Sequence, residues 1–134
     1  MTDLIACLSD NNKEIGHLKR VIEGEDWNKV FLIYDSNIEE KIESGKTIEY
    51  IPVNMSKTLS ELIEFLTTEF KTKVKGTEAA VNLICASGKE HMAVMSAIMK
   101  SGLGFRFAAI TKDGSRSLVN YLKLVLLFNH DLKS

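Results

Sequence analysis

Short apolar stretches alternate with amphipathic stretches along most of this chain. Leu4–Leu8 is apolar on both faces, as in a strand of a parallel sheet that is covered on both sides. Lys29–Asp35 is rich in β-branched and aromatic residues and ends in a polar turn, which predicts a second strand. Between them, Ile15, Leu18 and Ile22 recur at helical spacing. Because the alternation continues, we expect further strands over Thr47–Val53, Ala79–Ala86 and Phe105–Ile110.

Cap and turn residues indicate where further helices begin and end. Thr58 and Glu61 have the spacing of a capping box, and the clearest apolar helix face follows them. A short helix is expected from Ile38 to a stop at Gly45, and Ser117–Leu132 is expected to be helical or mixed. In the helix expected over Lys89–Ser101, one face carries three methionines that we expect to pack into the core: Met92, Met95 and Met99.

Strands that alternate with helices predict parallel pairing through right-handed crossovers. We therefore expect one domain over residues 1–134, an α/β, Rossmann-like three-layer fold with a mainly parallel sheet of five or six strands. Pro52 has no amide hydrogen to donate, which places its strand at an edge of that sheet.

Composition narrows the class of partner. The formal net charge of −1 gives no global reason to expect direct DNA or RNA binding or attraction to an acidic membrane. Cys7 and Cys85 lie in apolar runs and are expected to be reduced, buried thiols. Without a signal-peptide pattern or a bilayer-length apolar run, the chain is expected to be cytoplasmic. No cofactor or metal is expected, because GxxxxGK[ST], GxGxxG and closely spaced histidine pairs do not occur.

In an open parallel sheet, ligands bind outside the carboxyl ends of the strands. The residues that follow the expected strands are mostly small and polar, and they suit a phosphate or a ribose. Turns and helix caps use the same residue types for local hydrogen bonds, so this alternative stays open. The candidates from the first two strands are Ser9, Asp10, Asn11 and Ser36.

The turn after the fourth expected strand is the most informative. Ser87 and Gly88 would let a ligand approach the first free amides of the next helix. Lys89 in that first turn is unfavourable for the helix dipole, and either a bound phosphate or simple exposure would explain it. His91 could contact a ligand or act as an acid or base, although a solvated helix residue is the commoner case.

Two stretches resemble CARF domains, the CRISPR-associated Rossmann fold: VNLICASGKEHMAVMSAIMKSGLGFRFAAI and LIACLSDNNKEIGHLKRVI. The similarity spans about residues 3–120, with Ser87-Gly88 in place of a double glycine and Lys89 one place earlier than the family lysine. It implies a homodimer that binds a cyclic oligoadenylate across its two-fold axis. The same resemblance implies a pocket lined by Ser9, Asp10 and Asn11 from the first strand and by Ser87, Gly88 and Lys89 from the fourth.

The sequence therefore favours a nucleotide-binding sensor. Two alternatives stay open: a metal-independent ring nuclease that cleaves cyclic oligoadenylate, with Ser9 and Lys89 as candidate catalytic residues, or a Rossmann-like interaction protein without a CRISPR role. From Tyr121 to Phe128 only Lys123 is charged. Such a continuous apolar stripe favours burial between two copies, and we expect a two-fold homodimer with this segment in its interface.

Overall fold

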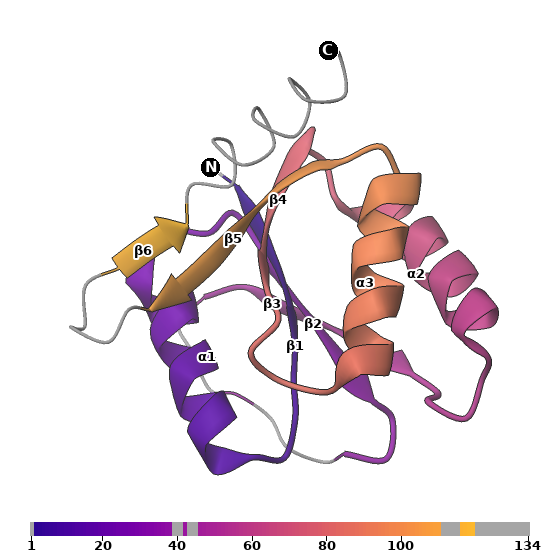
Figure 1. The fold of residues 1–134 in the computed structure, drawn as a ribbon. Helices are drawn as coiled ribbons and strands as arrows, with labels where there is room; N and C mark the ends of the chain where they lie inside the picture. Colours follow the sequence, from indigo (N-terminus) through magenta and orange to yellow (C-terminus); the bar gives the residue numbers. More distant parts are fainter. Residues whose placement is uncertain (1, 39–41, 43–45, 111–115, 120–134) are drawn as a thin grey trace, which may run out of the picture.

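The computed structural model describes residues 2–38, 42, 46–110 and 116–119. Six strands and three helices are arranged in it (Figure 1). In chain order they are β1 (Asp3–Cys7), α1 (Asn12–Gly24), β2 (Val30–Asp35), β3 (Ile48–Val53), α2 (Leu59–Lys73), β4 (Glu78–Asn82), α3 (Gly88–Lys100), β5 (Gly104–Ile110) and β6 (Arg116–Val119).

All strands belong to one sheet with the order β3-β2-β1-β4-β5-β6. The first five are parallel, and β6 pairs antiparallel with β5, Phe107 opposite Val119. The α/β, Rossmann-like fold expected from the sequence is thus confirmed. Pro52 lies in β3, which is an edge strand as predicted.

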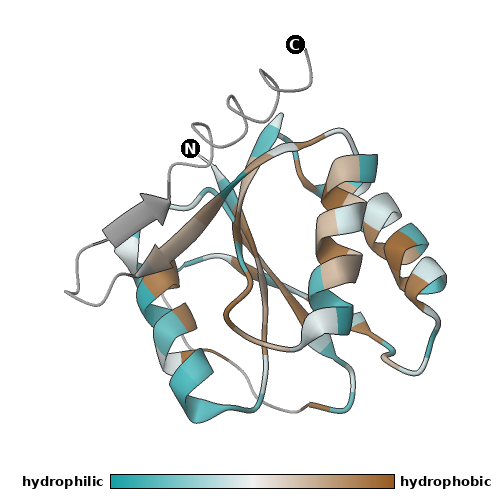
Figure 2. Ribbon diagram, viewed as in Figure 1, coloured by the Kyte–Doolittle hydropathy of each residue, from teal (hydrophilic) through white to brown (hydrophobic). Residues whose placement is uncertain are grey.

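The helices cover the sheet from two sides (Figure 1): α1 lies on one face, and α2 and α3 lie side by side on the other. This division follows from right-handed crossovers, because the chain moves in one direction from β1 to β2 and in the opposite direction from β3 to β4 and on to β5. The central strands are mainly apolar while α1 is mostly polar (Figure 2), and β1 is buried over its whole length. The core therefore fills the space between the sheet and both helical layers.

Side chains cap the first turns of α1 and α2. Thr58 and Glu61 form the expected capping box of α2, with the Glu61 amide donating to Thr58 Oγ1 and the Thr58 amide donating to Glu61 Oε1. Asn11 caps α1, since its Oδ1 accepts from the amides of Lys13 and Glu14 at 3.0 and 3.1 Å. These side chains satisfy amides that the first turn of a helix leaves without partners.

The prediction that the methionine face of α3 packs into the core is wrong. Met92 and Met99 are 57% and 61% exposed, and Met95 is only partly buried. The buried stripe lies on the opposite side of the helix and consists of small and branched residues: Ala93, Val94, Ala97 and Ile98. Small side chains suit this position, because α3 packs closely against both the sheet and α2.

Strand β4 ends at Asn82 and not at Ala86 as predicted. The buried Asn82 side chain explains the end, since its Oδ1 accepts from the Ile84 amide and its Nδ2 donates to the Ala108 carbonyl. The first contact turns the chain away from the sheet, and the second ties β4 to β5.

Two other predictions fall mainly outside the described residues. They are the short helix expected over 38–45 and the helical or mixed segment expected over 117–132, of which only β6 is described. Among the helices that are described, none is long and apolar enough to cross a bilayer. Cys7 and Cys85 are buried free thiols, as expected.

Candidate functional site

The strand order of the sheet reverses between β1 and β4, which neighbour each other although α1, β2, β3 and α2 separate them in sequence. At such a point, neighbouring loops diverge to opposite faces and leave a crevice beyond the strand ends. A cavity of about 160 Å³, here called the strand-end hollow, lies at these ends. Its lining residues come from β2, from the loops that follow β1 and β2, from the turn before α3 and from the first turn of α3: Leu8, Ser9, Asp10, Ile33, Tyr34, Asp35, Ile38, Ala86, Ser87 and Glu90.

Three of the predicted site residues, Ser9, Asp10 and Ser87, line the strand-end hollow. The structure thus brings together residues that lie almost eighty positions apart in the chain. The other predicted residues do not line the hollow: Asn11, Ser36, Gly88, Lys89 and His91.

Ser9 is held in place by the first turn of α1. Its Oγ donates to Glu14 Oε1 at 2.8 Å and accepts from the Asn11 amide at 3.3 Å, and the residue is 7% exposed. A hydroxyl fixed in this way has a defined direction before any ligand arrives.

The Lys89 side chain contacts a neighbouring loop and does not line the hollow. Its Nζ donates to the carbonyl oxygens of Met55 and Lys57, both at 2.8 Å, in the turn between β3 and α2. Lys89 is exposed, which is one of the two explanations left open by the sequence, but its contact with these carbonyls was not expected. Lys89 joins two loops at the carboxyl edge of the sheet, and it does not line the hollow that Ser9, its suggested catalytic companion, lines.

His91 and Ser36 also make local contacts. His91 Nε2 lies 2.7 Å from the Cys85 carbonyl oxygen, which can only accept, so this nitrogen carries a proton. The Ser36 amide donates to the Val53 carbonyl and continues the pairing of β2 with β3. Both residues therefore stabilise turns beside the hollow without lining it.

The constrained backbone position in the β4–α3 turn is Ala86 and not Gly88. Ala86 has φ of 73°, in the left-handed region that side chains with a Cβ adopt at a cost of about 1–2 kcal/mol. A Cβ added to Gly88 would meet no atom within 4 Å. Ala86 itself lines the hollow, so this turn places an energetically costly conformation at the candidate site.

Carboxylates dominate the polar chemistry of the hollow. Asp10, Asp35 and Glu90 line it, and none of the described lining residues is a lysine or an arginine. Glu90 Oε2 accepts from the amide of Ser87 at 3.0 Å and also from its hydroxyl. The hollow is therefore rich in hydrogen-bond acceptors and poor in positive charge.

Sequence reasoning missed Tyr34, Asp35 and Glu90 as lining residues. A signal existed for Asp35, because a polar residue that ends a buried strand lies at the edge where ligands bind. The residue expected to contribute from this turn, Ser36, is the next one along the chain. Glu90 lies three positions after Ser87, the capping spacing already recognised at Thr58 and Glu61.

The two thiols are poor nucleophiles in this setting. Burial raises the pKa of the Cys7 thiol, with further contributions from Glu90 and Cys85. Burial also raises the pKa of Cys85, although hydrogen bonding with Ser9 opposes the shift. Both side chains are therefore protonated near neutral pH, and their chemistry is that of small apolar core residues.

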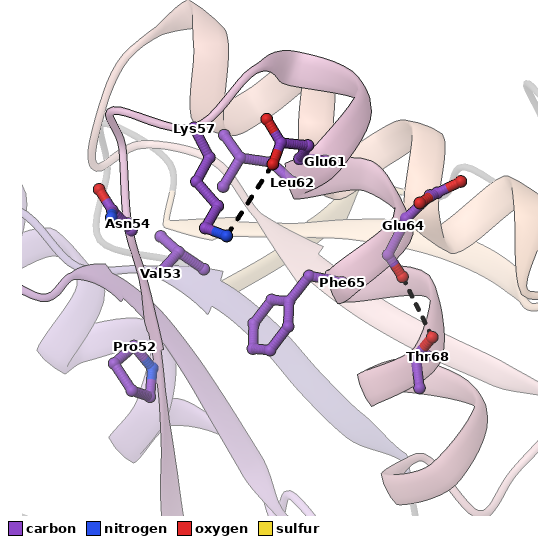
Figure 3. A pocket seen from close by; sticks show the side chains of 9 residues that line it. All are labelled: Pro52, Val53, Asn54, Lys57, Glu61, Leu62, Glu64, Phe65 and Thr68. Atoms are coloured by element: carbon purple, nitrogen blue, oxygen red, sulfur yellow. Dashed lines mark hydrogen bonds and ion pairs between the residues drawn. The ribbon is translucent and has the colours of Figure 1, made fainter.

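A second and larger hollow, here called the edge groove, lies between β3 and α2 (Figure 3). Its volume is about 580 Å³, and Phe65 and Pro52 lie across it from one another. Lys57 Nζ lies 3.9 Å from Glu61 Oε2 at its rim. The remaining lining residues are Val53, Asn54, Leu62, Glu64 and Thr68.

No family model matches this sequence, and no curated protein matches it significantly. Within the described part of the chain, no group of three histidine, cysteine, aspartate or glutamate side chains is arranged to hold a metal ion. The functional argument therefore depends on the geometry of the strand-end hollow.

Proposed function

We propose that this chain is a nucleotide-binding sensor domain of the CARF kind, which binds a cyclic oligoadenylate or a related nucleotide at the carboxyl ends of its strands. The observation that carries the proposal is the strand-end hollow at the reversal of strand order, lined by Ser9, Asp10 and Ser87 among others. Binding is favoured over ring cleavage, because Lys89 is engaged by the carbonyls of Met55 and Lys57 and does not line the hollow with Ser9.

Calorimetric titration with cyclic tetra-adenylate and cyclic hexa-adenylate tests this function. We expect saturable heat from at least one ligand. Ser87→Phe should abolish it, because this exposed position can carry a large ring that fills the small hollow. Phe65→Ala, in the edge groove, should bind with wild-type affinity. No heat with either ligand at high protein concentration would contradict the proposal.

The assembly that accompanies this function is a two-fold homodimer. Its interface includes the apolar segment that continues from Leu118 to Phe128, most of which lies outside the described residues. Replacing Leu122 and Val125 by Asp should give soluble monomers, because it places charge in a stripe whose burial contributes about 1.5–3 kcal/mol for each large side chain. A wild-type protein that sediments as a monomer at micromolar concentration would contradict the homodimer.

A further inference from the structure

We infer that the strand-end hollow holds the ribose of a ribonucleotide, with the Asp35 carboxylate accepting a hydrogen bond from the ribose 2′-hydroxyl. This inference rests on the proposed function and names the part of the nucleotide that the hollow recognises. Asp35 is the last residue of β2, beside β1 and the loop that leads from β1 into α1. In open parallel sheets, an acidic side chain in this position can accept from a ribose hydroxyl at the strand ends.

The hydrogen bonds of Asp35 leave room for such a donor. Its Oδ1 accepts from the Asn37 amide at 3.1 Å, which fixes the orientation of the carboxylate. Among the described residues, no donor reaches its Oδ2. An ionised carboxylate only accepts, and a ribose hydroxyl is a donor of suitable size.

Electrostatics argue against placing a phosphate in this hollow. Asp10, Asp35 and Glu90 would repel it, and no described lysine or arginine lines the hollow to neutralise it. The helix starts that could attract an anion are also occupied. Asn11 accepts from two amides of the first turn of α1, and Glu90 brings its own carboxylate to the start of α3.

The volume of the strand-end hollow suits one ring of the ligand and not the whole molecule. A cavity of 160 Å³ has the volume of about five water molecules. It is smaller than the roughly 300–1,000 Å³ typical of pockets that enclose a whole small-molecule ligand. The ribose therefore enters, while the base and the phosphates lie outside against the surrounding loops.

Matched calorimetric titrations test this assignment. Cyclic tetra-adenylate is compared with its all-2′-deoxy counterpart, on the wild-type protein and on Asp35→Asn. Wild type should bind the ribo form about 10- to 100-fold more tightly, the contribution of a hydrogen bond to a charged group. In Asp35→Asn the two affinities should approach each other, mainly through weaker binding of the ribo form. Asp26→Asn is the matched control, because it also removes one carboxylate but at a 93% exposed side chain outside the hollow. It should keep the wild-type ratio of the two affinities.

The outcomes separate this inference from the proposed function. No heat with either form would overturn the proposed function and the ribose assignment together. Equal affinity of wild type for the two forms would overturn the ribose assignment alone. An Asp35→Asn protein that keeps the full discrimination would overturn the role of Asp35. If that variant fails to fold by circular dichroism, the wild-type comparison still decides whether the 2′-hydroxyl contributes to binding.

Discussion

The edge groove and the strand-end hollow differ both in volume and in the elements that form them. The edge groove has a volume of about 580 Å³, against about 160 Å³ for the strand-end hollow. The larger one lies along a single edge strand and one helix, β3 and α2. The smaller one lies where the end of β2 and the loop after β1 meet the turn between β4 and α3, beside the point where the strand order reverses.

This difference shows why volume alone does not identify a site. The edge groove is open enough to leave Phe65 of α2 42% exposed beside β3 (Figure 3). Within it, Lys57 pairs with Glu61, and Thr68 Oγ1 donates to the Glu64 carbonyl (Figure 3). In the strand-end hollow, polar side chains come together from three parts of the chain, and this convergence, not the volume, makes it the candidate site.

The largest expected effect concerns the inner wall of the edge groove. Leu62 and Phe65 both line it, but Leu62 is 2% exposed and Phe65 is 42% exposed. Leu62→Ala should lower the free energy of unfolding by about 2–5 kcal/mol, because it leaves a cavity between α2 and the sheet. Phe65→Ala should cost less than about 1.5 kcal/mol, since much of its ring is already in water. Urea denaturation measures both; equal losses would mean that Phe65 packs like a core residue and that the groove is not open.

A smaller effect is expected at the rim of the strand-end hollow. Asn11→Ala should lower the free energy of unfolding by about 0.5–2 kcal/mol, because two amides of α1 lose their acceptor. Ser36→Ala, at the neighbouring turn, should change it by less than about 0.5 kcal/mol, since only its amide hydrogen bond is described. The comparison uses thermal or urea unfolding. If the two losses match, Asn11 does not act as a helix cap.

The sequence predicted the order of strands and helices well, because several independent signals specify where these elements lie. Leu4–Leu8 is apolar on both faces, Pro52 excludes a central position, and Thr58 with Glu61 marks a helix start. Each signal acts through covalent geometry or through neighbouring residues, so it can be recognised without knowledge of the tertiary fold.

The side chains around the site were less predictable, because their partners are distant in sequence. Lys89 finds carbonyl acceptors more than thirty residues away. The spacing of Met92, Met95 and Met99 placed them on one face of α3, but spacing cannot tell which face turns inward. That choice depends on how closely α2 approaches, which favours Ala93 and Ala97 on the buried side.

The smallest expected effect is a pH-dependent change in stability at Glu49, which ties β3 to the C-terminal end of α2. Glu49 on β3 lies 2.8 Å from the Lys73 Nζ of α2 and 2.9 Å from the Lys29 Nζ. Hydrogen bonds from Lys73 first, and then from Lys29, lower the pKa of Glu49 below its ordinary value of 4.5. The folded protein therefore binds fewer protons at Glu49 than the unfolded chain does, and the stabilisation is complete above about pH 5 and is lost as the pH falls through the lowered pKa.

Glu49→Gln removes this contribution. Because the pair is partly exposed, the difference in unfolding free energy from wild type should be about 0.5–1 kcal/mol near pH 7. The difference should shrink as the pH falls below the ordinary value of 4.5 and through the lowered pKa of Glu49, since the wild-type carboxyl group then becomes protonated. Glu64→Gln, at an exposed position of α2 without a described ion pair, is the matched control and should show little change at either pH. A Glu49→Gln difference that stays constant as the pH falls would mean that α2 is held to β3 by packing alone, and that the charges around Glu49 contribute no measurable stability.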